Sequence, residues 1–329
     1  MNKKLRTFLI ILAIAIVVSF LAVSVYTGEQ VFRGCVLLTD NEKTALNREK
    51  SYGLGENGQS YVIEQISIPS SLGTHEIPAD YISCDGDKNR DTVILAHGLG
   101  GNRLSNYPIA EMFLRHGFNV ISYDQRATGE NLAQYNTFGY LESKDTIDYV
   151  NYADKLIDAD KAIVLWGTSF GGATVGMAMA DDYVNQRVGA AVLDCPVSSM
   201  SEMTTEQIKR ISDDTGIPVS YMLWTGELAL KRHLGFSFED AEITDYVSKS
   251  QIPLLVINTK ADKVTPYHMG VDIYEASAAE LRDIFTVEDS AHANIFFDYR
   301  EEYERRIFLL LDSVLPARSA ELNEEQLAA

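Results

Sequence analysis

A serine between glycines is the strongest chemical signal in this sequence. Residues 167–172 read GTSFGG, with the apolar run AIVLW before them and a stretch of small residues after them. This is the strand–turn–helix context in which a G-x-S-x-G turn exposes a nucleophilic serine. The flanking glycines let the strand and helix approach closely, and the start of the helix favours negative charge beside Ser169. We therefore expect Ser169 to be a nucleophile.

A serine hydroxyl needs a base, and the base needs an acid that orients it. His292, in the segment DSAHANIF after the last apolar run, is the histidine best suited to be the base. Asp262, in the segment NTKADKVTP after another apolar run, is the expected acid. Asp194, which ends the run GAAVLD, is the rival acid, and Asp289 is expected to point away from His292.

Acyl transfer also requires N–H donors for the charge that develops on the substrate oxygen. We expect one donor to be the backbone N–H of Phe170, the residue after the serine. The second is expected from the loop HGLGGN at 97–102, because its glycines let the backbone curl towards the site. Leu99 is the expected donor and Gly98 the alternative, while His97 is expected to brace the loop.

Short apolar runs alternate with helical patterns from residue 60 onward, which predicts an α/β fold with a doubly wound, mostly parallel sheet. The expected strands are 61–68, 76–83, 92–98, 119–124, 162–167, 189–194, 253–258 and 281–287. The expected helices are 105–116, 142–157, 170–180, 267–279 and 293–312. Because open α/β sheets place their sites at the carboxyl ends of strands, Ser169, Asp262 and His292 should meet there. The alternation breaks at about 200–250, where we expect a small helical cap insertion or an ordinary two-helix crossover.

The N-terminal segment differs in composition from the rest of the chain. Lys3, Lys4 and Arg6 precede the apolar stretch FLIILAIAIVVSFLAVSVY at 8–26, which is long enough to cross a bilayer. We expect residues 1–27 to be a signal anchor or transmembrane helix, with a cleaved signal peptide and a buried core helix as alternatives. Basic residues stay in the cytoplasm, so the remainder would be extracellular. Residues 28–59 are then a linker and stem, 60–316 the hydrolytic domain and 317–329 an acidic tail.

Composition limits the partners. The 329-residue chain has a formal net charge of −19, which argues against nucleic acid as a partner. Its three cysteines cannot form a disulfide framework and lack zinc-site spacing. The proposed chemistry needs no metal and no cofactor, so we expect none.

The motifs HGLGGN, DQRATGEN, GTSFGG, ADKVTP and SAHANI together resemble the α/β-hydrolase family. They look most like bacterial membrane-anchored or secreted serine hydrolases of the esterase and prolyl-oligopeptidase branches. Members commonly carry D-x-R-G-x-G-x-S, and here Ala127 replaces the first glycine, which alters the expected loop. We expect Asp124 and Arg126 of that run to form a structural ion pair.

The leading functional prediction is a serine hydrolase acting on a carboxylic ester or related acyl bond. Its partners would be a small-molecule or peptide acyl substrate and the membrane, through the N-terminal helix. A serine peptidase or aminopeptidase of the prolyl-oligopeptidase type is the first alternative. A catalytically inactive surface-binding module is the second. Location at the cell membrane, single-pass with the catalytic domain outside, is expected, and secretion is the alternative.

Overall fold

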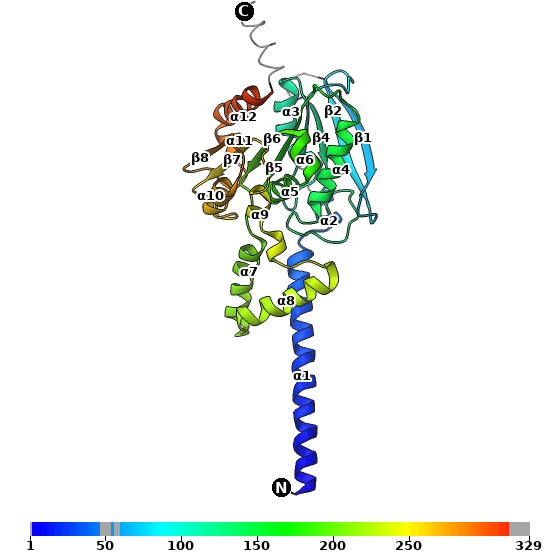
Figure 1. Ribbon diagram of the computed structural model, residues 1–329, viewed down its shortest axis with the longest axis vertical. Helices are drawn as coiled ribbons and strands as arrows, with labels where there is room; N and C mark the ends of the chain where they lie inside the picture. Colours follow the sequence, from blue (N-terminus) through cyan, green and yellow to red (C-terminus); the bar gives the residue numbers. More distant parts are fainter. Residues whose placement is uncertain (1, 47–53, 56–59, 316–329) are drawn as a thin grey trace, which may run out of the picture. The chain divides into compact units, whose positions relative to one another are not determined.

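The computed structural model describes residues 2–46, 54–55 and 60–315, and within them the chain forms one eight-stranded sheet (Figure 1). The strands are β1 (Val62–Pro69), β2 (Glu76–Ser83), β3 (Thr92–Ala96), β4 (Asn119–Tyr123), β5 (Ile163–Thr168), β6 (Val188–Asp194), β7 (Leu254–Thr259) and β8 (Arg282–Val287). Their order is β1-β2-β4-β3-β5-β6-β7-β8. Only β1 with β2 and β2 with β4 pair antiparallel, and the other pairs are parallel. The predicted doubly wound, mostly parallel sheet is confirmed.

Helices cover both faces of this sheet, which is why the central strands are apolar at almost every position. The helices of this part are α2 (Asn41–Leu46), η2 (Arg103–Asn106), α3 (Tyr107–Arg115), α4 (Glu142–Asp154), α5 (Phe170–Ala178), α6 (Asp182–Arg187), η3 (Glu239–Ala241), α9 (Ile243–Val247), α10 (Tyr267–Ala276), α11 (Ile295–Asp298) and α12 (Arg300–Val314). One core packs alternate strand residues such as Leu95 and Trp166 against α3 and α12. Helices α4, α5 and α10 contact the same strands as well, so the sheet is sandwiched.

Strand register aligns the carboxyl ends that carry the predicted site. Ala96 of β3 pairs with Gly167 of β5, and Gly167 pairs with Leu193 of β6. Leu193 pairs in turn with Val256 of β7. The chain therefore leaves β5, β6 and β7 at the same edge, and the loops there can meet.

The chain divides into two compact units. One consists of Met1–Leu37 with Met200–Asp240, and the other of Leu38–Ser199 with Ala241–Ala329. The first unit holds α1 (Lys3–Val36), α7 (Met200–Thr215) and α8 (Val219–Leu234). The predicted insertion at about 200–250 is thus grouped with the N-terminal helix up to residue 240, and its role as a cap stays a prediction.

Helix α1 is the one helix among the described residues that is long and apolar enough to cross a membrane, by length and composition. Its apolar window is fully exposed to the surroundings, unlike a core helix. The helix also continues through Val36, although a linker is predicted from residue 28 onward. The reason is packing, because Gly28, Val31 and Phe32 lie against α8 and hold those turns helical. The predicted acidic tail lies outside the described residues, as do positions 47–53 and 56–59 of the predicted linker.

Candidate active site

Ser169 lies in a tight turn between β5 and α5, with φ of 54° and ψ of −117°. A non-glycine residue in this left-handed region is strained, and such strain is common at functional sites. The turn needs both flanking glycines. A Cβ on Gly167 would lie 2.2 Å from the Gly171 carbonyl oxygen, and a Cβ on Gly171 would lie 2.1 Å from the Ala96 oxygen. The Ser169 amide is fixed by the Asp194 carbonyl, 2.7 Å away.

The structure brings Ser169, His292 and Asp262 into one hydrogen-bonded series. His292 Nε2 lies 2.9 Å from Ser169 Oγ, and His292 Nδ1 lies 2.7 Å from Asp262 Oδ2. Because Asp262 can only accept when ionised, Nδ1 donates to it and Nε2 can accept the serine proton. The Asp262 side chain is 2% exposed and that of His292 is 17% exposed, so the imidazole can be reached from outside while the carboxyl is sheltered.

Asp262 is held in its charged form. Burial alone would raise its pKa, but the hydrogen bond from His292 and the Val264 N–H outweigh burial and lower the pKa of this carboxyl. Its Oδ1 accepts the backbone N–H groups of Val264 and Thr265, at 2.8 and 2.9 Å. The Thr265 hydroxyl lies 3.0 Å from Oδ2 and 3.1 Å from the Cys195 carbonyl. An ionised Asp262 favours the imidazole tautomer in which Nδ1 carries the proton.

Thr265 was missed by the sequence analysis. The segment DKVT could have indicated it, because an aspartate that accepts N–H groups two and three residues later forms an Asx-type turn. Strain was also missed at two loop positions, Cys195 after β6 and Ala293 after His292, which have φ of 45° and 55°. Neither residue type signals positive φ, so only the fold reveals it.

Asp194, the rival acid, is in the same region with different partners. Its Oδ2 accepts the Tyr303 hydroxyl at 3.0 Å, and Trp166 donates its indole N–H to the same hydroxyl oxygen, also at 3.0 Å. Burial raises the pKa of Asp194 to about 6. In the described part of the chain, Asp262, and not Asp194, is hydrogen-bonded to His292.

The loop after β3 passes beside the serine. A Cβ built on Gly98 would lie 3.5 Å from Ser169 Cβ. His97 is buried and braces this loop, since its Nδ1 lies 2.8 Å from the Gly98 oxygen and its Nε2 accepts the Gln125 N–H at 3.1 Å. Within residues 60–315, the backbone N–H groups of Leu99 and Phe170 have no hydrogen-bond acceptor. Both amides therefore remain available for an external acceptor.

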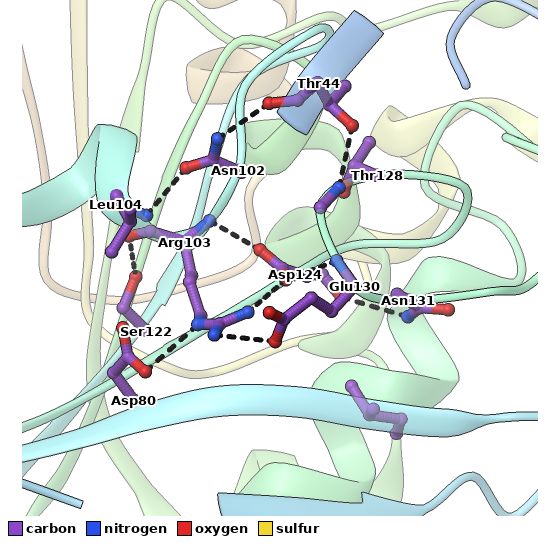
Figure 2. A network of polar contacts seen from close by, with 12 residues as sticks. Thr44, Asp80, Asn102, Arg103, Leu104, Ser122, Asp124, Thr128, Glu130 and Asn131 are labelled. Atoms are coloured by element: carbon purple, nitrogen blue, oxygen red, sulfur yellow. Dashed lines mark hydrogen bonds and ion pairs between the residues drawn. The ribbon is translucent and has the colours of Figure 1, made fainter. Parts of the chain in front are cut away.

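A buried ion network fixes the other end of that loop, as Figure 2 shows. Arg103 donates from Nε to Asp80 at 3.0 Å and from Nη2 to Glu130 at 2.8 Å, and it also pairs with Asp124. The predicted pair of Asp124 with Arg126 is therefore wrong. Asp124 faces Arg103 across two neighbouring strand ends, whereas Arg126 Nε donates to the Tyr135 carbonyl.

Asn102 joins the same loop to α2. Its side-chain amide donates to the Thr44 carbonyl at 3.0 Å, and its Oδ1 accepts the Leu104 N–H at 2.9 Å. The Thr44 hydroxyl in turn accepts the Gly129 N–H at 2.8 Å. The segment after α1 thus helps to position the loop that carries Leu99 (Figure 2).

Two cavities adjoin the series of three side chains. One of about 320 Å³ is lined by Leu99, Thr168 and Ala293, with aromatic walls from Trp166 and Phe296. The second, of about 520 Å³, is lined by His292 and by residues such as Val264 and Ser290. Both volumes lie within the range of small-molecule sites.

One cluster of potential metal ligands coincides with these residues. Atoms of Cys195, Asp262 and His292 lie within 4.8 Å of one another. Burial, and then the charge of Asp194, raise the pKa of the Cys195 thiol well above its usual range. A protonated thiol is a poor ligand, and His292 already engages Asp262 through Nδ1. The donor set therefore favours hydrogen bonding over metal ligation.

Comparison with known proteins agrees with this architecture. The model of a protein family described as "alpha/beta hydrolase fold" matches residues 91–245. The chain is 22% identical over 276 residues to uncharacterized protein YqkD of Bacillus subtilis (strain 168), covering 84% of this chain and 88% of that protein. It is 27% identical over 241 residues to uncharacterized protein YfhR of Escherichia coli (strain K12), covering 71% and 72%.

A solved structure gives the same result for the fold. The Pyrococcus furiosus esterase Pf2001 aligns with a TM-score of 0.62 at 19% identity, over 80% of this chain and 97% of that chain. At 19% sequence identity this similarity is a similarity of fold. The chain therefore has the α/β-hydrolase fold, and over residues 91–245 it is similar to the family that carries this fold.

Proposed function

We propose that this chain is a serine hydrolase that cleaves a carboxylic ester or a related acyl bond. The observation that carries the proposal is the hydrogen-bonded series from Asp262 through His292 to Ser169, with separations of 2.7 and 2.9 Å. A nucleophile within reach of a base, and a base held by a buried acid, is the arrangement that acyl transfer requires.

The proposed reaction has two halves. Ser169 Oγ attacks the substrate carbonyl while His292 Nε2 takes the hydroxyl proton, and His292 then gives that proton to the leaving alcohol. Water, deprotonated by the same nitrogen, attacks the acyl-enzyme and releases the acid and the free serine. Asp262 stabilises the imidazolium that forms in each half.

Two backbone amides are proposed to bind the oxyanion. The N–H groups of Phe170 and Leu99 lack other acceptors among the described residues of this unit, and the loop of Leu99 adjoins Ser169. Donors fixed before the reaction stabilise the developing charge without rearrangement, and removal of one such donor costs about 10²–10³ in rate. The bracing of the loop by His97 and Arg103 supports this role.

The substrate is proposed to be a small acyl compound. The cavity beside Leu99 has aromatic walls and one carboxyl group, that of Asp194, so it suits an uncharged and largely apolar group. Pf2001 is an esterase, and the shared fold is compatible with the same bond type here. An amide or peptide substrate is the alternative that the experiment below separates.

We also propose that α1 anchors the protein in the cell membrane, with the hydrolytic unit outside. Support comes from the exposed apolar window of α1 and from the basic residues Lys3, Lys4 and Arg6 before it. A secreted form would result if the same segment were cleaved. Resistance of the full chain to alkaline extraction from membranes would support the anchor, and release into the soluble fraction would contradict it.

The test of the proposed activity compares the wild-type chain with Ser169→Ala on p-nitrophenyl esters from acetate to laurate. We expect the variant to lose turnover by about 10³-fold or more with its fold intact. Ser248→Ala is the matched control, because it removes an exposed serine hydroxyl of the same unit.

Each outcome has a defined meaning. Equal turnover of wild type and Ser169→Ala would refute the nucleophile assignment. Labelling of Ser169 by a fluorophosphonate without ester turnover would favour the peptidase alternative. No labelling of the folded wild-type chain would favour an inactive surface-binding module.

A further inference from the structure

Helices α1 and α8 pack with almost no space between their backbones. A Cβ on Gly28 of α1 would lie 2.5 Å from the Thr225 carbonyl oxygen of α8. A Cβ on Gly226 of α8 would lie 2.2 Å from Val31 Cγ1 of α1. Small residues at a helix crossing permit this close approach. The two helices are therefore held in one packing arrangement. The position of α8 along the axis of α1 follows from the residues of α1 that it contacts.

The contact begins inside the apolar stretch of α1. The Tyr221 ring lies 6.1 Å from the Phe20 ring, and its hydroxyl lies 2.8 Å from Ser24 Oγ. Ser24 donates to the Phe20 carbonyl, so Tyr221 donates to Ser24. At ~1.5 Å per residue, Ser24 and Phe20 lie about 3 and 9 Å before the end of the apolar stretch at Tyr26. If this stretch spans the bilayer, Tyr221 lies at its outer boundary.

The outward side of α8 is apolar at the same level. Trp224 and Leu228, four residues apart and so on one face, are each 52% exposed. They line a groove of about 180 Å³ together with Leu21 and Val25 of α1. This groove joins the exposed apolar surface of α8 to that of α1. An apolar environment that surrounds α1 would therefore also contact this face of α8.

Charge is distributed along α8 as a membrane boundary would require. The charged residues lie in its second half, where Glu227 pairs with Lys231 at 2.6 Å and His233 lies 2.8 Å from Glu29 of α1. Glu29 is also the first acidic residue of the chain. The aromatic side chains of Tyr221 and Trp224 lie in the first half, and Trp and Tyr are enriched at membrane–water boundaries.

Two carboxylates limit how deeply the helix can enter. Asp213 and Asp214 are exposed in the last turn of α7, shortly before α8 begins. Their two negative charges would oppose binding to anionic lipid. A zwitterionic phospholipid surface fits this distribution of charge better than an anionic surface.

We propose that the first half of α8, Val219–Gly226, lies in the outer boundary layer of a phospholipid bilayer, with Trp224 and the adjoining Leu228 against acyl chains. The inference rests on the proposed membrane anchor α1. It adds a second membrane contact to the anchor, made by a segment that lies far along the sequence from it. The chain then meets the bilayer through two helices that belong to one packed unit.

The chain carries a built-in probe for this arrangement. It has two tryptophans, and Trp166 is 2% exposed whereas Trp224 is 52% exposed. We would reconstitute the full-length chain in phosphatidylcholine vesicles whose acyl chains carry bromine, a short-range quencher of tryptophan emission. The matched variant is Trp224→Phe, which leaves Trp166 as the sole tryptophan.

We expect brominated lipid to remove most of the Trp224 emission, measured as the difference between wild type and Trp224→Phe. The emission of the variant should change little. Flotation with the vesicles is measured on the same samples, and fluorophosphonate labelling of Ser169 reports the hydrolytic unit independently. Flotation without quenching of Trp224 would overturn the inference alone and would point to a protein occupant of the groove. Failure to float would overturn the anchor as well, while labelling would still judge the proposed activity.

Discussion

Replacement of Asp262 by asparagine removes one charge and little volume, and it perturbs the proposed site at its most sheltered point. The carboxylate accepts Val264 and Thr265 N–H groups through Oδ1 and the His292 Nδ1–H through Oδ2. An asparagine oxygen can keep the turn, but its NH₂ group then faces Nδ1. The imidazole proton then moves to Nε2, and a protonated Nε2 can no longer accept the proton of Ser169. We expect kcat to fall by about 10⁴-fold, equivalent to about 5 kcal/mol of the activation barrier.

Asp194→Asn is the matched comparison, because this carboxyl is buried nearby and has different partners. Its Oδ2 accepts the Tyr303 hydroxyl, which an amide oxygen can also do. The activation barrier should therefore rise by at most about 1 kcal/mol, the net value of one hydrogen bond, which is less than tenfold in kcat.

The assay is kcat on one p-nitrophenyl ester, with circular dichroism and thermal unfolding to show that both variants are folded. A mild effect of Asp262→Asn together with a severe effect of Asp194→Asn would assign the acid to Asp194 and refute the role proposed for Asp262. Equal losses in two folded variants would show that neither hydrogen bond controls the imidazole.

Three further predictions concern stability. Burial raises the pKa of Asp194 to about 6, above its unfolded value, so ionisation of this carboxyl destabilises the native state as pH rises from about 4 to 6. Over that range the free energy of unfolding of Asp194→Asn, measured with urea, should rise by on the order of 3 kcal/mol relative to that of wild type. A difference between variant and wild type that does not change with pH would refute this. Arg103→Met leaves the carboxylates of its network unpaired and should lower the free energy of unfolding by on the order of 3–5 kcal/mol, whereas Arg305→Ala, which removes the exposed pair with Glu302, should change it little. Gly171→Ala should lower the melting temperature sharply, because its Cβ would meet a backbone oxygen, while Gly34→Ala, with open space around it, should not; equal melting temperatures would contradict the close packing behind Ser169.

The strands could be predicted because each central strand is buried on both faces, so that apolar runs such as TVILA and PLLVIN mark them directly. The positions of the candidate site residues could be predicted from the same apolar runs. Ser169, Asp262 and His292 each come shortly after such a run, and aligned strand ends bring those loops together. Helix ends were less certain, and the single helix expected at 293–312 is interrupted at Tyr299.

Contacts set by non-local packing could not be predicted. The partner of Asp124 is Arg103, because β3 and β4 are neighbours in the sheet, whereas sequence proximity pointed to Arg126. The continuation of α1 to Val36 depends on α8, which lies far away in the sequence. Glycines 28 and 226 carry no periodic signal that would reveal their mutual packing.

The most direct test of the central claim is to identify the residue that a fluorophosphonate modifies. The full-length wild-type chain is treated with the probe, digested and mapped by mass spectrometry, beside His292→Ala and Ser248→Ala. We expect a single adduct on Ser169, formed equally in Ser248→Ala and strongly slowed in His292→Ala, because the imidazole must take the serine proton. An adduct on another residue, or an undiminished rate in folded His292→Ala, would contradict it.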